Sequence, residues 1–171
     1  MKYRLINGID CDIYKNDIKE AYDSCPLVFD SQNIYAPKTA DDTCDWVKGF
    51  TNSEDSIVYG IFDDMEEYLY GVIIFDNIRA TLENSSAEVH IVNHKSIFGR
   101  RIRDLYDDLV NACGIDNIYA MIPSIAVHTI AICKRLGFKK TGYIPKALPY
   151  INSEHKEKMY DIQIYTREIK K

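Results

Sequence analysis

The order of its extended and helical patterns is the feature that most constrains this chain. Three extended runs rich in Ile, Val, Tyr and Phe follow one another at Ser56–Phe62, Tyr68–Phe75 and Ala87–Val92. The acidic turn Asp63–Glu67 separates the first two runs, so they are expected to form an antiparallel hairpin. The third run alternates its side chains and leads into a long helical pattern. A sheet of neighbouring strands is therefore expected in the middle of the chain.

The long helical pattern has one apolar face, on which apolar residues recur every three or four positions. Its members are Phe98, Ile102, Leu105, Leu109 and Cys113. Gly114 follows and is expected to end the helix.

Both ends of the chain add further elements. The N-terminal third predicts a strand at 10–14 and two short helices, the first capped at Asn16 and the second at Thr39, with Asp42 closing the turn. The C-terminal part predicts strands at 117–122, 138–144 and 159–167, a helix at 125–136 capped by Ser124, and a long loop at 145–158. The predicted order is β-α-α-β-β-β-α-β-α-β-β. We expect one α/β domain over residues 1–171, with a mixed sheet of six to seven strands and helices on both faces.

Composition narrows the class of protein. A length of 171 residues fits a single core, and the net charge of −5 is poorly suited to a nucleic-acid backbone. Five scattered cysteines without a paired or zinc-binding spacing favour a reduced setting and no metal. No apolar run reaches the roughly 18 residues that would span a bilayer. We expect a cytoplasmic protein that binds neither nucleic acid nor membrane.

The start of the long helix is the most informative junction. A helix that follows a strand presents free N–H groups and the positive end of its dipole, which together favour an anion. Gly99 would allow close backbone approach, and Lys95, Arg100, Arg101 and Arg103 add positive charge. This arrangement indicates a phosphate site. Solvated arginines that pair with Asp104, Asp107 and Asp108 at helical spacing are the alternative explanation.

The segment Lys134-x-x-Gly137-Phe138-x-x-x-Gly142 closes the next helix. Together with the element order over 57–142, it resembles the GNAT superfamily of acetyl-CoA-dependent N-acetyltransferases. The family's Gln/Arg-x-x-Gly-x-Gly/Ala motif is degraded here. Gly99 matches its first glycine when Ser96 and Arg101 occupy the outer positions, whereas a shift by one residue fits the helix core better and loses Gly99.

The resemblance implies acetyl-CoA as co-substrate and an amine of a small molecule or protein as acceptor. Backbone groups at Val89, Ile91 and Val92 would pair with the pantetheine arm, and Ser124 would lie near the cofactor. The phosphates would be held by the loop and helix start, which are Ile97, Phe98, Gly99, Arg100, Arg101, Ile102 and Arg103. We expect a monomer or a homodimer.

The resemblance also suggests catalytic candidates. Family members often carry a glutamate base on the strand before the loop, so Glu88 is the first choice. His90 is the second, because residues two apart share a strand face. Cys133 occupies the place of the family's tyrosine acid, where a small core residue is the commoner explanation, and Tyr119, Tyr143 or Tyr150 could be a displaced acid. Two further side chains, Trp46 and His128, are expected to be packing residues, with Trp46 alternatively a wall of the acceptor pocket.

Two other readings of the sequence stay open. The missing tyrosine and the eroded glycine motif also fit a GNAT-fold binding or structural module without turnover, for example a virus-encoded one. A different nucleotide-binding α/β protein is the weaker alternative, because the chain has neither a P-loop nor a Gly-x-Gly-x-x-Gly motif.

Overall fold

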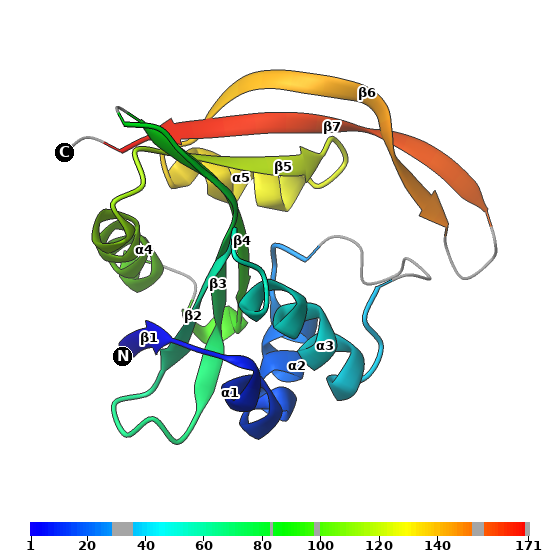
Figure 1. The fold of residues 1–171 in the computed structure, drawn as a ribbon. Helices are drawn as coiled ribbons and strands as arrows, with labels where there is room; N and C mark the ends of the chain where they lie inside the picture. Colours follow the sequence, from blue (N-terminus) through cyan, green and yellow to red (C-terminus); the bar gives the residue numbers. More distant parts are fainter. Residues whose placement is uncertain (29–35, 83, 98–99, 152–155, 170–171) are drawn as a thin grey trace.

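The computed structural model describes residues 1–28, 36–82, 84–97, 100–151 and 156–169, and of residues 100–102 the backbone only. Seven strands and five α-helices are formed in this part of the chain (Figure 1). The strands are β1 (Lys2–Leu5), β2 (Ile57–Phe62), β3 (Leu69–Ala80), β4 (Ser85–Asn93), β5 (Asn117–Pro123), β6 (Lys139–Ile151) and β7 (Glu157–Glu168). The helices are α1 (Gly8–Ile13), α2 (Lys15–Ser24), α3 (Ala40–Thr51), α4 (Arg100–Cys113) and α5 (Val127–Arg135), with a short 3-10 turn at Lys95–Ile97.

The strands form one mixed sheet in the order β1-β2-β3-β4-β5-β7-β6. Among the described strands, β4 and β5 pair in parallel and the other neighbouring pairs are antiparallel. The parallel connection runs through α4, as a parallel pair requires a crossover. The predicted mixed sheet is confirmed.

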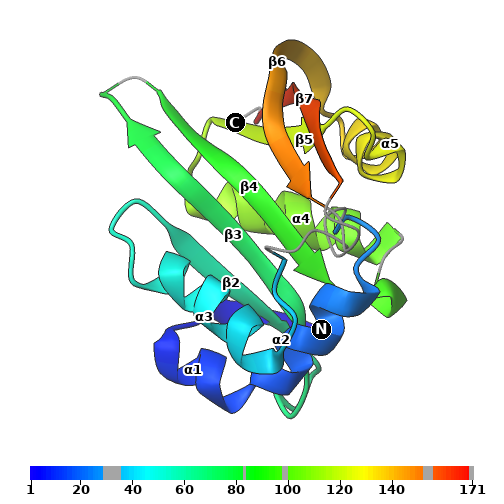
Figure 2. The ribbon, with the colours of Figure 1, turned by 90° about the vertical axis from the view of Figure 1, so that its right-hand side faces the viewer.

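Two apolar cores lie on the two faces of this sheet. Along β3, Val72 and Ile74 belong to the core under α1, α2 and α3, whereas Ile73 and Phe75 belong to the core under α4 and α5. Figure 2 shows the three N-terminal helices together on one side of the sheet. The expected cover of helices on both faces is therefore confirmed.

The N-terminal prediction was partly wrong. The segment expected to be a strand at 10–14 is the end of helix α1, which the sequence pattern missed. Asn7 caps this helix: its side chain accepts hydrogen bonds from the N–H groups of Ile9 and Asp10, and the Asp10 carboxylate accepts one from the N–H of Asn7. The first strand lies earlier, where Lys2–Leu5 pairs with β2.

Other helix ends test the predicted caps. Thr39 and Asp42 form the expected capping box of α3, and Gly114, with φ 65°, follows the last residue of α4. Asn16 is not a cap, because α2 begins one residue earlier at Lys15. Ser124 is not a cap either, since α5 begins at Val127 and its N-cap position is Ala126.

The C-terminal hairpin is longer than predicted. Most of the expected loop at 145–158 belongs to strands, because β6 continues to Ile151 and β7 starts at Glu157. The pairing register shifts between Ile144 and Leu148, where Lys146 has φ 48° and donates its N–H to Asp161. Two prolines concealed this strand from the sequence pattern. They are tolerated because β6 is an edge strand.

Among the described residues, no helix is both long enough and apolar enough to cross a bilayer.

Candidate active site

A cleft opens where the two parallel strands separate. β4 and β5 pair only at Ser86–Asn117, Ala87–Ile118 and Glu88–Tyr119. Beyond Glu88 the strands diverge, so the backbone edge of β4 at 89–92 has no partner in β5. The cleft has a volume of about 860 Å³ and is lined on the β4 side by Val89, His90, Ile91 and Val92. On this edge the Ile91 carbonyl accepts a hydrogen bond from the Cys25 thiol at 3.7 Å, and the Val92 carbonyl faces Gly71 of β3. The remaining backbone groups of the edge are available to a ligand that can hydrogen-bond to them.

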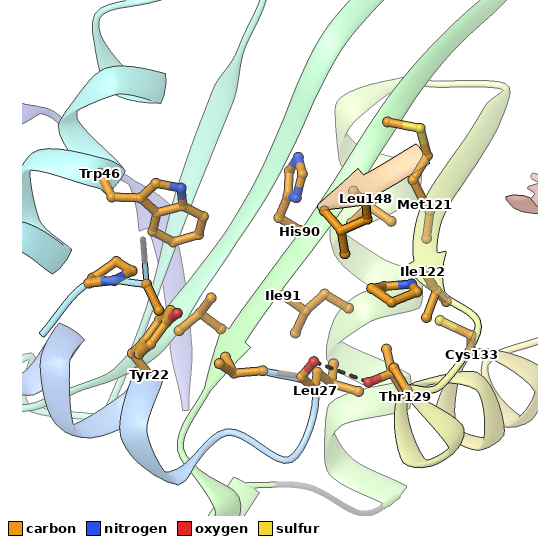
Figure 3. A pocket seen from close by; sticks show the side chains of 18 of the residues that line it. Tyr22, Leu27, Trp46, His90, Ile91, Met121, Ile122, Thr129, Cys133 and Leu148 are labelled. Carbon is orange, nitrogen blue, oxygen red and sulfur yellow. Dashed lines mark hydrogen bonds between the residues drawn. The ribbon is translucent and has the colours of Figure 1, made fainter. Parts of the chain in front are cut away.

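The cleft has two unlike walls, seen from close by in Figure 3. One wall comes from α2 and α3 and includes Tyr22 and Trp46, which are in edge-to-face contact at 6.2 Å between ring centroids. The other wall comes from β5 and α5, with Met121 and Cys133 among its residues. The walls meet where the Thr129 hydroxyl donates to the Leu27 carbonyl at 3.1 Å, which links α5 to the segment after α2.

Glu88 lies behind this cleft rather than in its lining. Its side chain is almost fully buried, and it accepts a hydrogen bond from the Asn77 amide at 3.5 Å. Burial raises the pKa of the Glu88 carboxyl, and the neighbouring Asp76 carboxylate raises it further. Glu88 is thus a weaker acid than an exposed glutamate and a correspondingly better proton acceptor once ionised.

His90 connects Glu88 with the cleft. It lines the cleft, and its ring is tilted against Phe50 at 5.4 Å between centroids. Its Nε2 atom is buried without a hydrogen-bond partner, 3.8 Å from Glu88 Oε1 and 4.0 Å from Asp76 Oδ2. Burial lowers the pKa of His90 and outweighs the opposite effect of Asp76, so a neutral imidazole is favoured at neutral pH. The shared strand face predicted for Glu88 and His90 is present.

The lowered pKa of His90 predicts how stability depends on pH. Because the native pKa lies below the unfolded value of about 6.5, the unfolded chain binds more protons between the two. The resulting stabilisation is present above pH 6.5 and is lost as the pH falls through the native pKa. Urea unfolding at pH 7, 6 and 5 should therefore show that the free energy of unfolding falls more steeply with decreasing pH in the wild type than in His90→Gln. The same change at the exposed His128 should leave the slope as in the wild type, and equal slopes in all three would contradict the prediction.

The cluster of Asp76, Glu88 and His90 raises the question of a metal. One donor atom from each lies within 4.8 Å of the others. Two atoms bound to one zinc ion at about 2.1 Å in tetrahedral geometry lie about 3.4 Å apart. The distances from His90 Nε2, 3.8 and 4.0 Å, are longer than this. The cluster is therefore not arranged for a tetrahedral zinc ion, and we describe it as a set of titratable groups.

Cys133 lies on α5, where it fits both predictions made for it, a small core residue and a candidate acid at the site. It belongs to the apolar core and also lines the cleft. Burial raises the pKa of its thiol to about 11, so the thiol is protonated at neutral pH. Among the alternative acids, the Tyr143 side chain is exposed and Tyr150 packs edge-to-face on Tyr160.

The predicted phosphate loop is described only in part. Phe98 and Gly99 lie outside the described residues, as do the side chains of Arg100, Arg101 and Ile102. Within the described part, Ile97 is buried in the 3-10 turn and Arg103 lies 4.0 Å from Asp107 on the next helical turn. The arginine–aspartate pairing considered as an alternative is thus present for Arg103.

The structure also places three further residues considered in the sequence, Ser124, Trp46 and His128. Ser124 donates its N–H to the Asp161 carbonyl at 2.8 Å and is absent from the cleft lining. Trp46 is half-buried and contacts Phe50 at 5.3 Å, so it both packs and forms the cleft wall. His128 is exposed, and its expected role as a packing residue was wrong.

The sequence reasoning missed Asp76, which lies opposite Glu88 in the β3–β4 register. It follows the second extended run directly and therefore lies just outside the predicted hairpin. Which residue of the third run it faces depends on register, and a β-bulge changes that register after Asp76.

The family model described as Acetyltransferase (GNAT) domain matches residues 12–160. The chain belongs to the GNAT acetyltransferase family. The family-level prediction of an N-acetyltransferase domain is thereby confirmed. A search of curated proteins found no match.

Solved structures of GNAT proteins share the fold at low sequence identity. A putative phosphinothricin N-acetyltransferase is 21% identical, with 99% of each chain covered and a TM-score of 0.65. A spermidine N-acetyltransferase variant from Vibrio cholerae is 12% identical, with 98% of this chain and 95% of that chain covered and a TM-score of 0.66. A ribosomal-protein-S5-alanine acetyltransferase from Vibrio fischeri is 16% identical, with coverage of 98% and 92% and a TM-score of 0.67.

Proposed function

We propose that this GNAT protein transfers the acetyl group of acetyl-CoA to a primary amine of a small molecule or protein. The observation that carries the proposal is the unpaired backbone edge of β4 at 89–92, which faces a cleft of about 860 Å³. This edge fits an amide-containing arm such as that of acetyl-CoA, because amides pair with free strand edges. Two of the structural neighbours are named as acetyltransferases of spermidine and of a ribosomal protein, and both names are in keeping with an amine acceptor.

The chain's residues have distinct roles in this proposal. Val89 and Ile91 hold the pantetheine arm through their backbone groups, whereas Val92, whose carbonyl faces Gly71 of β3, does not. The N-terminus of α4 at Arg100 attracts the phosphates through its free N–H groups. Acetyl-CoA supplies the activated acyl group. The amine must be a free base when it attacks the acetyl group, and His90 lies between the cleft and Glu88. Glu88 therefore accepts the amine proton through His90 or an intervening water.

Acetyl transfer makes one bond and breaks another. The amine nitrogen forms a bond to the acetyl carbon, and the carbon–sulfur bond breaks. The proton removed from the amine resides on Glu88, and the leaving thiolate needs a proton in turn. Cys133, which is buried in the cleft wall and protonated at neutral pH, is the candidate donor, and it regains its proton from solvent.

Binding of acetyl-CoA should be visible as thermal stabilisation. At 100 times its dissociation constant, a ligand that binds only the folded state adds about 2.7 kcal/mol, which raises Tm by about 5–10 °C in a chain of this size. Differential scanning fluorimetry with acetyl-CoA and, as a control, acetate at the same concentration checks this. An unchanged Tm at millimolar acetyl-CoA would contradict the proposal.

Turnover separates the proposal from the alternative of a binding module. Release of free thiol should depend on both acetyl-CoA and an added amine, with the acetylated amine detected by mass spectrometry. Stabilisation by acetyl-CoA without transfer to any amine of a broad panel would favour the binding module. A cytoplasmic location, a monomeric or homodimeric state, and the lack of nucleic-acid and membrane partners stay predictions from the sequence.

A further inference from the structure

Two carboxylates lie directly behind His90, which lines the cleft, and among the described residues neither has a lysine or arginine partner. We call this part of the cleft the acceptor side. Asp76 on β3 and Glu88 on β4 are cross-strand neighbours, and their side chains are 21% and 7% exposed. Their hydrogen-bond donors are neutral groups. The Ser56 hydroxyl donates to Asp76 at 2.7 Å, and the Asn77 amide donates to Asp76 at 3.0 Å and to Glu88 at 3.5 Å.

The backbone around Asn77 holds this pair of carboxylates in place. Asn77 has φ 51°, a left-handed conformation that is uncommon outside glycine and in which asparagine is enriched. It lies in the irregularity between Asp76 and Arg79, where β3 changes register against β4. Such bulges redirect side chains next to functional sites. Here the bulge places one amide within reach of both carboxylates.

The nearby basic groups do not neutralise the pair. Arg79 is two residues beyond Asn77, but its guanidinium pairs with the exposed Asp55 at 3.0 Å. His90 Nε2 lies at 3.8 and 4.0 Å without a hydrogen bond, and burial favours its neutral form. Within the part of the chain that the structure describes, no lysine or arginine forms an ion pair with Asp76 or Glu88.

Two aromatic rings of α3, Phe50 and Trp46, continue from His90. Phe50 packs against His90 at 5.4 Å, and Trp46 packs edge-to-face on Phe50 at 5.3 Å, so the rings continue from the carboxylates to the cleft wall. Aromatic faces attract ammonium groups, and buried negative charge attracts them more strongly. A carboxylate on the incoming molecule would instead be repelled by Asp76 and Glu88, which is the kind of unfavourable contact that creates specificity.

We infer that the acceptor is a primary amine with no carboxylate beside its amino group, an alkyl or arylalkyl amine rather than an amino acid, and that Asp76 selects it. The inference rests on the proposed function and specifies the substrate class of that site. Asp76 acts as a positioning residue: it attracts the ammonium form to the acceptor side of the cleft, next to His90 and Glu88, which remove the proton.

Three acceptors that share one side chain test this selection: phenethylamine, phenylalaninamide and phenylalanine. The first two lack the carboxylate, and the amide keeps a substituent of similar size. For the wild type we expect kcat/KM at least 10-fold higher for the amine and the amide than for the amino acid. Asp76→Asn should reduce this ratio at least 5-fold, chiefly through a higher KM for phenethylamine. Asp55→Asn, which removes a nearby exposed carboxylate, should leave the ratio unchanged.

Binding to the CoA-loaded protein gives a readout that does not depend on turnover. Calorimetry should show phenethylamine bound at least 5-fold more weakly by Asp76→Asn than by the wild type, and both variants should melt within a few degrees of the wild type. Equal use, or equal binding, of phenylalanine and phenethylamine by the wild type would overturn the inference and leave the transferase proposal intact. Selective amine binding without any transfer would support the inference and contradict the transferase proposal.

Discussion

Replacing Glu88 by glutamine is expected to lower kcat at least about 100-fold while leaving acetyl-CoA binding unchanged. General-base catalysis contributes about 10²- to 10⁴-fold, and glutamine keeps the size of the side chain and its acceptor for the Asn77 amide while removing the proton acceptor. Steady-state thiol release with phenethylamine measures kcat, and the acetyl-CoA-dependent rise in Tm reports binding. Glu67→Gln, an exposed glutamate in the β2–β3 turn, is the matched control and should retain wild-type values.

The pH profile distinguishes Glu88 from His90 as the final proton acceptor. Activity requires ionised Glu88, so it should be lost as the pH falls through the Glu88 pKa, which burial and Asp76 raise above the ordinary value. His90→Gln should lower the rate and keep this acidic limb, whereas Glu88→Gln should abolish it. An acidic limb that survives in Glu88→Gln, or a kcat within 3-fold of the wild type, would remove Glu88 from the role.

Elements with a strong local period could be predicted from the sequence. The apolar stripe that includes Leu105 and Leu109 identified α4, and Gly114 marked its end. Helix α1 was missed because its six residues give a weak period, and the capping box of Asn7 and Asp10, rather than the pattern, marks its start. The extension of β6 was missed because pairing with β7 outweighs the turn propensity of Pro145 and Pro149.

In the candidate site, too, local features could be predicted from the sequence and long-range contacts could not. Glu88 and His90 were predicted together because the alternation of a strand is a local property. Their relations to Asp76 and Phe50 could not be predicted, because strand register and helix packing depend on residues far apart in the sequence. The uncompensated charge at the acceptor side therefore becomes visible only when β3, β4 and α3 are assembled.

Gly71→Ala should cost about 3 kcal/mol or more of unfolding free energy and weaken acetyl-CoA binding. Gly71 has φ 152° and pairs with Asn93 at the end of β4. A Cβ there would lie 2.3 Å from both the Val92 carbonyl and the Asn93 Oδ1, so β4 must move away from β3. That movement displaces the strand end from which the cofactor loop continues. Urea unfolding and the acetyl-CoA-dependent rise in Tm measure the two effects.

Gly49→Ala provides the matched control on α3. A Cβ at Gly49 meets no atom within 4 Å beyond its own helix, and alanine is more stable than glycine in a helix interior by about 0.5–1 kcal/mol. The same substitution should thus stabilise the protein at Gly49 and destabilise it at Gly71. If Gly49→Ala raises the free energy of unfolding and Gly71→Ala lowers it, close backbone contact with β3 holds the end of β4 in place. If Gly71→Ala unfolds at the same urea concentration as the wild type, β4 tolerates displacement there, and the cofactor edge at 89–92 is not held by Gly71.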